Sequence, residues 1–191
     1  AVGDDVEAEI HFQPFELNPD MAPEGENTTE HVIKKYGSNP ERSAASRNAM
    51  RESGDALGFT FNYGPQSRIW NTFDAHRLLH WAGVEGKQLE LKEALFKTNF
   101  TDQLSTSDHE VLVGAAVAAG LDEERARQVL ASGEFTDEVR RDEMLWRNRG
   151  ISAVPSVIFN QRWMVQGGQP PQVFEQAIRQ IVSGNAEDAR A

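Results

Sequence analysis

Hydrophobic and polar residues alternate at the start of the chain. Residues 6–12 read VEAEIHF, and every second residue is apolar. A period of two is expected of a strand that buries one face. Pro14 and Pro19 follow, and each lacks a backbone N–H that a strand could donate. We therefore predict a strand over residues 6–12 and a shaped loop from there to residue 26.

The spacing of apolar residues becomes helical after this loop. Asn27 stands three positions before an acidic residue, as a helix N-cap does, and the short apolar stripe that follows ends at Gly37. Asn39 and Pro40 repeat the start signal, because proline at the first helical position loses no hydrogen bond. These patterns predict a short helix after Asn27 and a second helix over residues 40–56.

The middle of the chain is mostly helical in pattern. Residues 59–63 read FTFNY, whose alternation indicates a brief extended piece. From Asn71 to about Gly150, helical stretches are interrupted by glycines and restarted by capping residues such as Ser107 and Asp122. We expect four or five packed helices in this part.

The spacing of apolar residues along the chain changes again after Gly150. Two short apolar runs, residues 157–159 and 163–165, are separated by a polar turn, which predicts a hairpin. A double proline then opens an amphipathic helix that extends to Val182. The polar tail over residues 184–191 is expected to fray.

Composition narrows the classes of function. The 191 residues carry a net charge of -11, which disfavours nucleic acid and anionic lipid as partners. No apolar run approaches the roughly 20 residues that cross a bilayer, so a membrane protein is not expected. The first ten residues, AVGDDVEAEI, lack the basic and apolar regions of a secretory signal, and a cytoplasmic location is the expectation.

The chain contains no cysteine. Disulfides, thiolate metal ligands and cysteine nucleophiles are therefore absent from these residues. Any thiol chemistry must be supplied from elsewhere.

Four stretches in order carry a family resemblance. They are PFELNPDMAPEG (14–25), NTFDAHRLLHWA (71–82), ISAVPSVIFN (151–160) and VQGGQPPQVFEQAI (165–178). Together they resemble the FrnE-like branch of the DsbA family, which is related to 2-hydroxychromene-2-carboxylate isomerases and kappa-class glutathione transferases. The resemblance covers nearly the whole chain.

The resemblance implies an α/β thioredoxin-like fold with a large all-helical insertion. Residues 1–26 and 150–183 would form a partial thioredoxin-like domain, residues 27–149 the insertion and residues 184–191 a tail. Residues 6–12 match the second strand of the family, so the first strand, the first helix and the CxxC motif are expected to be missing from this chain. The resemblance also leads us to expect that residues 6–12 pair with the strand at 156–159 or its hairpin partner.

The best candidate site follows from the same resemblance. In thioredoxin-like proteins the proline equivalent to Pro155 is cis, and the backbone of the preceding residue pairs with the bound substrate. This implies a substrate-binding role for Ala153, Val154 and Pro155. A trans proline that merely opens a strand is the structural alternative.

Other candidate substrate-binding residues lie in loops and at a helix start. Asn18 could bond a substrate carbonyl, or its loop could be only a rigid turn. Asn71 and His76 resemble a pocket-facing helix of the isomerase relatives, although His76 could equally satisfy a core hydrogen bond. Gly168 and Gln169 match a loop over the thiol ligand, or they simply turn the chain.

Three functions remain open. The first is a thiol–disulfide oxidoreductase whose redox cysteines lie in a segment absent from this chain, acting on a protein or small-molecule thiol or disulfide. The second is a glutathione-dependent isomerase or transferase with serine in place of cysteine. The third is a cysteine-free binding module with exposed strand edges.

The expected ligands are few. We expect no tightly bound cofactor, with glutathione as the candidate small ligand, and a homodimer stays open. His76 and His80 share one helix face, but no third ligand accompanies them, so we predict no metal site.

Overall fold

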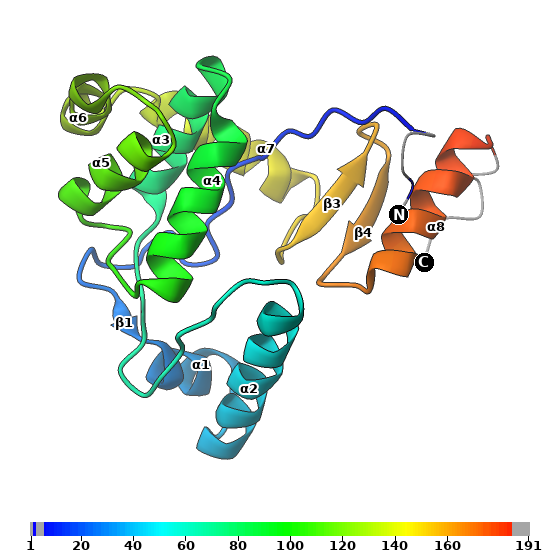
Figure 1. Cartoon of the computed structure of the whole chain (residues 1–191), viewed down its shortest axis with the longest axis horizontal. Coiled ribbons are helices and arrows are strands. Elements are labelled where there is room, and N and C mark those ends of the chain that lie inside the picture. Colours follow the sequence, from blue (N-terminus) through cyan, green and yellow to red (C-terminus); the bar gives the residue numbers. More distant parts are fainter. Residues whose placement is uncertain (1, 3–5, 185–191) are drawn as a thin grey trace. The chain divides into compact units, whose positions relative to one another are not determined.

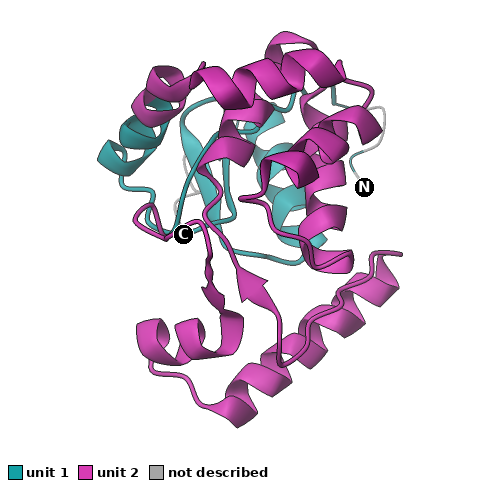
Figure 2. Cartoon of the chain, turned by 90° about the vertical axis from the view of Figure 1, so that its left-hand side faces the viewer, with its two compact units in different colours: residues 1–17, 142–191 teal, residues 18–141 magenta. Residues whose placement is uncertain are grey.

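The computed structural model describes residue 2 and residues 6–184. The chain divides into two compact units: unit 1, residues 1–17 and 142–191, and unit 2, residues 18–141 (Figure 2). The predicted tail lies outside the described residues from position 185 onward. The expected domain boundaries after residues 26 and 149 stay a prediction.

Unit 2 begins with a two-stranded ribbon and a pair of helices. The antiparallel strands β1 (Glu26–Asn27) and β2 (Arg68–Ile69) flank α1 (Thr28–Tyr36) and α2 (Pro40–Ala56). The Asn27 side chain accepts hydrogen bonds from the first turn of α1, and Gly37 ends that helix in the left-handed conformation. The helices predicted after Asn27 and over residues 40–56 are therefore confirmed. The short ribbon was not predicted.

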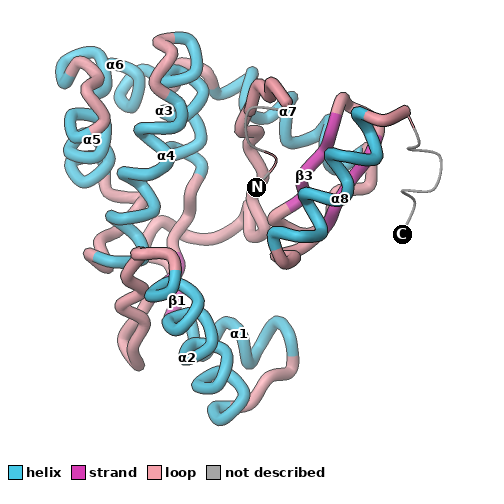
Figure 3. The backbone as a smooth tube through the Cα atoms, turned by 45° about the vertical axis from the view of Figure 1, so that its right-hand side comes forward, coloured by secondary structure: helices cyan, strands magenta, loops and turns pink. Residues whose placement is uncertain are grey.

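The rest of unit 2 is a helical bundle. Helix α3 packs against α4, α5 and α6, and α4 packs against α5 (Figures 1 and 3). The bounds are α3 (Phe73–Val84), α4 (Gln88–Phe96), a π-helical turn (Lys97–Thr101), α5 (His109–Ala118), α6 (Glu123–Ser132) and α7 (Thr136–Asn148), whose last turns belong to unit 1. The expectation of four or five helices is confirmed.

One buried apolar cluster holds this bundle together. Leu78, Leu91, Leu112 and Val129 are fully buried in it, one from each of α3 to α6. Burying such side chains contributes about 1.5–3 kcal/mol each, which makes this cluster the main source of stability in unit 2.

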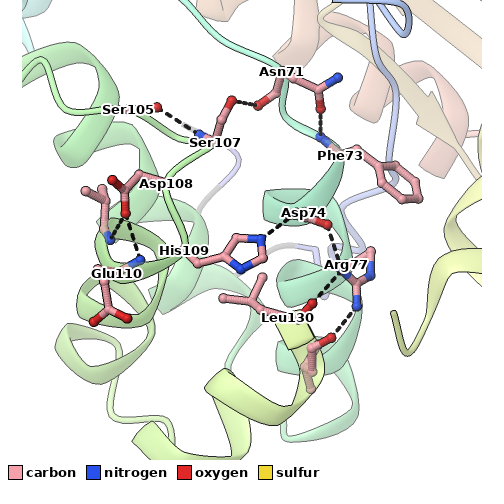
Figure 4. A network of polar contacts seen from close by, with 12 residues as sticks. Asn71, Phe73, Asp74, Arg77, Ser105, Ser107, Asp108, His109, Glu110 and Leu130 are labelled. Carbon is pink, nitrogen blue, oxygen red and sulfur yellow. Dashed lines mark hydrogen bonds and ion pairs between the residues drawn. The ribbon is translucent and has the colours of Figure 1, made fainter. Parts of the chain in front are cut away.

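A buried arginine in α3 links this helix to the C-terminal end of α6. Arg77 is 3% exposed, and its guanidinium donates to the carboxylate of Asp74 (2.6 Å) and to the backbone carbonyls of Val129, Leu130 and Glu134 (Figure 4). The last carbonyls of a helix have no partner within it and carry partial negative charge. Arg77 therefore satisfies the α6 terminus from a neighbouring helix.

Unit 1 contains the predicted hairpin and final helix. Strands β3 (Ser156–Phe159) and β4 (Trp163–Gln166) are antiparallel, and α8 (Pro171–Val182) lies beside them in Figures 1 and 3. The two turn residues, Asn160 and Gln161, both have positive φ, and this conformation matches the twist of the strands. The hairpin and the helix are confirmed.

Two expectations were wrong. Residues 6–12 form no strand and pair neither with β3 nor with β4. A strand exists only where a neighbour takes its backbone hydrogen bonds in a regular ladder, and an alternating pattern alone does not supply that ladder. Ser107 is not a helix cap, because Asp108 caps α5 and Ser107 Oγ donates instead to the Asn71 carbonyl (2.8 Å). Asp122 caps α6 as expected.

Candidate functional site

One end of the β3–β4 hairpin brings two predicted loops together. Ser156 pairs with Gln166, so the residues before β3 and after β4 meet at this end. The Gly167 N–H donates to the Pro155 carbonyl at 2.8 Å. Most of the predicted site residues therefore lie together, namely Ala153, Val154, Pro155, Gly168 and Gln169.

The loop before β3 presents its backbone to the surroundings. The Val154–Pro155 peptide bond is cis, as the resemblance implied. Val154 is 44% exposed, and within the described residues neither its N–H nor its C=O forms a hydrogen bond. Ala153 differs, since its carbonyl accepts from Ser156 Oγ at 2.8 Å. The residue before the proline thus keeps both backbone groups available for a ligand.

The loop after β4 is closed by its own hydrogen bonds. Gly167 has a φ of 84°, which favours glycine, and its carbonyl accepts from the Gln169 N–H at 3.0 Å. The Gln169 side chain donates to the Gln166 carbonyl at 3.1 Å. Gly168 is exposed and has no side chain, so another backbone can approach it closely.

Comparison with known proteins supports the resemblance inferred from the sequence. Residues 1–179 match the family described as DSBA-like thioredoxin domain. The chain belongs to this family. The crystal structure of a probable DsbA oxidoreductase from Streptomyces coelicolor is similar to this DSBA-like chain, with a TM-score of 0.83 and 35% identity. The match covers 88% of this chain and 73% of that one. Comparison with curated proteins gives no significant match.

Family membership settles the fold class. The chain is a helix-rich α/β protein of the DsbA type, with a thioredoxin-like domain and small sheets. DsbA-like proteins need no tightly bound cofactor. None of the described helices is long and apolar enough to span a bilayer.

Asn18 of this DSBA-like chain lies in unit 2, and its side chain is already engaged. Its Oδ1 accepts from Lys35 Nζ at 2.5 Å, and its backbone carbonyl accepts from the Met21 N–H at 3.1 Å. These contacts hold the loop against α1. They agree with the structural reading of Asn18, while its binding role stays a prediction.

Asn71 is similarly committed to structure. Its Nδ2 donates to the Met21 carbonyl (2.8 Å), its Oδ1 accepts from the Phe73 N–H (2.9 Å), and its carbonyl accepts from Ser107 (Figure 4). All three bonds fix the start of α3. His76 lies one turn further along this helix and is half-buried. Its predicted binding role is not tested by these contacts.

A polar network that the sequence reasoning missed lies next to these residues. The Asp74 carboxylate accepts from Arg77 through Oδ1, while its Oδ2 lies 2.8 Å from His109 Nε2 (Figure 4). The i,i+3 spacing of Asp74 and Arg77 was a visible signal, but nothing in the spacing pointed to His109. This network ties α3 to α5 and α6.

The described residues give no sign of a metal centre. No group of three histidine, aspartate or glutamate side chains among them is close enough to hold an ion. The His80 ring packs against the Phe135 ring, with 5.1 Å between the two ring centres. The hairpin end offers the backbone groups of Val154 and its exposed apolar side chain to a ligand.

Proposed function

We propose that this DSBA-like chain is the substrate-binding scaffold of a thiol–disulfide oxidoreductase. The observation that carries the proposal is the hairpin end, where the exposed Gly168 follows β4 and the Val154 backbone groups form no hydrogen bond among the described residues. Family membership and the similar probable oxidoreductase support it. Because the 191 residues contain no cysteine, the reactive cysteine pair belongs to residues outside this sequence.

The proposed role of the hairpin end is to hold an extended substrate. The N–H of Val154 would donate to a substrate carbonyl and its C=O would accept a substrate N–H, as at the edge of a sheet. Its side chain would contact the apolar part of the substrate. Gly168 would let the substrate backbone approach without a Cβ in the way.

The chemistry in this proposal is thiol–disulfide exchange. One cysteine thiolate attacks a substrate sulfur, a mixed disulfide forms, and the other substrate sulfur leaves as a thiolate. A second cysteine thiolate then attacks the first cysteine's sulfur in the mixed disulfide, so the substrate leaves as a thiolate and the cysteine pair becomes a disulfide; the reverse sequence oxidises a substrate dithiol. The residues of this chain bind and orient the substrate during both steps. Protein disulfides and glutathione disulfide are the proposed substrates.

The intact mass of the protein purified from its source, combined with thiol titration in denaturant after reduction and removal of the reductant, tests this proposal. We expect a mass above 21.3 kDa and two reactive thiols. A mass of 21.3 kDa with no thiol would refute the oxidoreductase function. A heavier protein without thiols would also refute it and would favour the glutathione-dependent isomerase or transferase.

Binding to the 191-residue chain tests the location of the site. Calorimetry with a peptide that contains an intramolecular disulfide should give binding to the unmodified chain and to Val154→Ala, which keeps both backbone groups. Val154→Pro should weaken binding about tenfold, since it removes one N–H donor. Equal affinity of the two variants would place the binding site elsewhere.

A further inference from the structure

Two carbonyls of the loop before β3 are occupied by hydrogen bonds within unit 1. The Ala153 carbonyl accepts from Ser156 Oγ at 2.8 Å, and the Pro155 carbonyl accepts from the Gly167 N–H at 2.8 Å. The Val154 carbonyl, which lies between them in the chain, forms no hydrogen bond among the described residues. Of these three carbonyls, the loop therefore offers the middle one to a ligand.

The two bonds differ in how far they depend on the sequence. The bond from Gly167 joins two backbone groups, so it does not require a particular side chain. The bond from Ser156 requires a side-chain hydroxyl. Serine hydroxyls commonly bond backbone groups a few positions away and so hold a local bend. Ser156 is thus the side chain that occupies the Ala153 carbonyl.

Strand β3 gives this hydroxyl a fixed starting point. Ser156 is the first residue of β3 and pairs with Gln166, and the next residue, Val157, pairs with Val165. The backbone of Ser156 is therefore held by the hairpin. Its bond to the Ala153 carbonyl fastens the preceding bend to this strand.

We propose that Ser156 is a positioning residue that sets the register in which a substrate pairs with this loop. Because its hydroxyl occupies the Ala153 carbonyl, a substrate N–H finds its acceptor at Val154 rather than one residue earlier. Ser156 acts through the loop that it holds. This role rests on the proposed substrate-binding function of the hairpin end.

The register of the substrate matters for the proposed chemistry. Successive side chains of an extended segment point to opposite sides, so a shift by one residue turns every side chain to the other face. In thiol–disulfide exchange the attacking thiolate must reach one sulfur of the substrate. A substrate that is held in a single register presents that sulfur in a single place.

Calorimetry on the 191-residue chain with the disulfide-containing peptide tests this role. The chain has no cysteine, so the peptide disulfide stays intact during the titration. Ser156→Ala should weaken binding about fivefold, because the loop loses one hydrogen bond. Ser156→Thr keeps a hydroxyl on a residue that strands favour, so its affinity should stay within about twofold of the unmodified chain.

Ser152→Ala is the matched control. Ser152 is exposed in the same loop, and its side chain forms no hydrogen bond among the described residues. This variant should bind the peptide as the unmodified chain does. Thermal denaturation of all three variants checks that each is folded at the temperature of the titration.

Peptides that each carry one backbone N-methyl group test the register. The methyl group removes a single N–H donor, so the position that weakens binding most identifies the substrate residue that pairs with Val154. With the unmodified chain, one position should weaken binding about tenfold. In Ser156→Ala the same position should weaken it only about threefold, because the Ala153 carbonyl becomes a second acceptor. A purely structural role of Ser156 would leave this pattern unchanged.

The possible failures are distinguishable. If the peptide does not bind the unmodified chain, the hairpin end is not the binding site, and the role of Ser156 is refuted with it. If the peptide binds Ser156→Ala as tightly as Ser152→Ala, the role of Ser156 is refuted while the proposed function stands. The same pattern of N-methyl effects in Ser156→Ala and in the unmodified chain would refute control of the register.

Discussion

The helical bundle of unit 2 and the hairpin of unit 1 bury their apolar side chains to different extents. Every residue of the large buried cluster lies in the bundle, between Ala75 and Leu130. The described side chains of β3, β4 and α8 include no buried one. Because apolar burial is the main favourable term in folding, we expect the bundle to be the more stable part. The candidate binding loops therefore sit on the less buried scaffold, where backbone groups stay accessible.

The largest expected effect comes from the buried charge in the bundle. Arg77→Met removes the donor to Asp74 Oδ1, to the last carbonyls of α6 and to the Glu134 carbonyl, which should cost about 3–5 kcal/mol. Urea denaturation followed by far-ultraviolet circular dichroism measures the loss. Arg141→Met, at an exposed position of α7, should change the free energy of unfolding by less than about 0.5 kcal/mol. Equal effects of the two variants would contradict the structural role of Arg77.

Truncation of apolar side chains compares the two units directly. Leu112→Ala in α5 removes a fully buried side chain and should cost about 2–5 kcal/mol. Ile178→Ala in α8 removes a half-buried side chain and should cost about half as much. Thermal denaturation of both variants gives the comparison. A larger loss in α8 than in α5 would mean that unit 1 is better packed than the exposure of its residues indicates.

Low pH should lower the stability of the bundle, because it protonates the carboxylates of ion pairs on the surface. The hydrogen bond from Arg127 lowers the pKa of Glu110 below its ordinary value of 4.5, and Arg125 lowers the pKa of Glu134 in the same way. A lowered folded pKa adds stability above pH 4.5, and this stability is lost as the pH falls through the folded pKa. We expect the melting temperature to fall below pH 4.5, and Arg127→Gln to make the fall shallower. If the melting temperature of Arg127→Gln falls with pH as steeply as that of the unmodified chain, the ion pairs of Arg127 do not cause the loss of stability in acid.

The smallest effect is expected at the hairpin turn. Gln161 has a φ of 58°, a conformation that glycine adopts without the steric cost of a Cβ. Gln161→Gly should stabilise unit 1 by about 0.5–1 kcal/mol, because relief of the left-handed strain, about 1–2 kcal/mol, exceeds the gain in entropy of the unfolded chain, about 0.4–1 kcal/mol. Hydrogen exchange of the β3 and β4 amides measures this gain locally. Faster exchange in the variant would show that the Gln161 side chain itself stabilises the turn.

Features that depend on nearby residues could be predicted from the sequence. The N-caps Asn27 and Asn39 bond backbone groups two or three positions away, so their spacing was sufficient. The hairpin was equally local. The strand predicted over residues 6–12 failed because alternation records a tendency, whereas a strand requires a partner that spacing does not reveal.

The contrast between contacts of nearby residues and contacts of distant residues also explains which parts of the candidate site could be predicted. Pro155 and Gly167 are separated by one hairpin, so predicting the hairpin also placed them together. Asn18 and Asn71 looked available in the sequence, but Lys35 and the Met21 carbonyl occupy their side chains. Contacts between residues so far apart depend on packing of the whole unit and leave no periodic signal.

The buried guanidinium of Arg77 has a consequence for the order of folding. One acceptor, Asp74, lies in the same helix as Arg77. The others lie in the last turn of α6 and in the loop after it, more than 50 residues further along the chain. The charge cannot leave water at low cost until α6 has formed and docked. We therefore expect Arg77 to be desolvated late, after the transition state, so that its removal mainly accelerates unfolding and leaves the folding rate nearly unchanged.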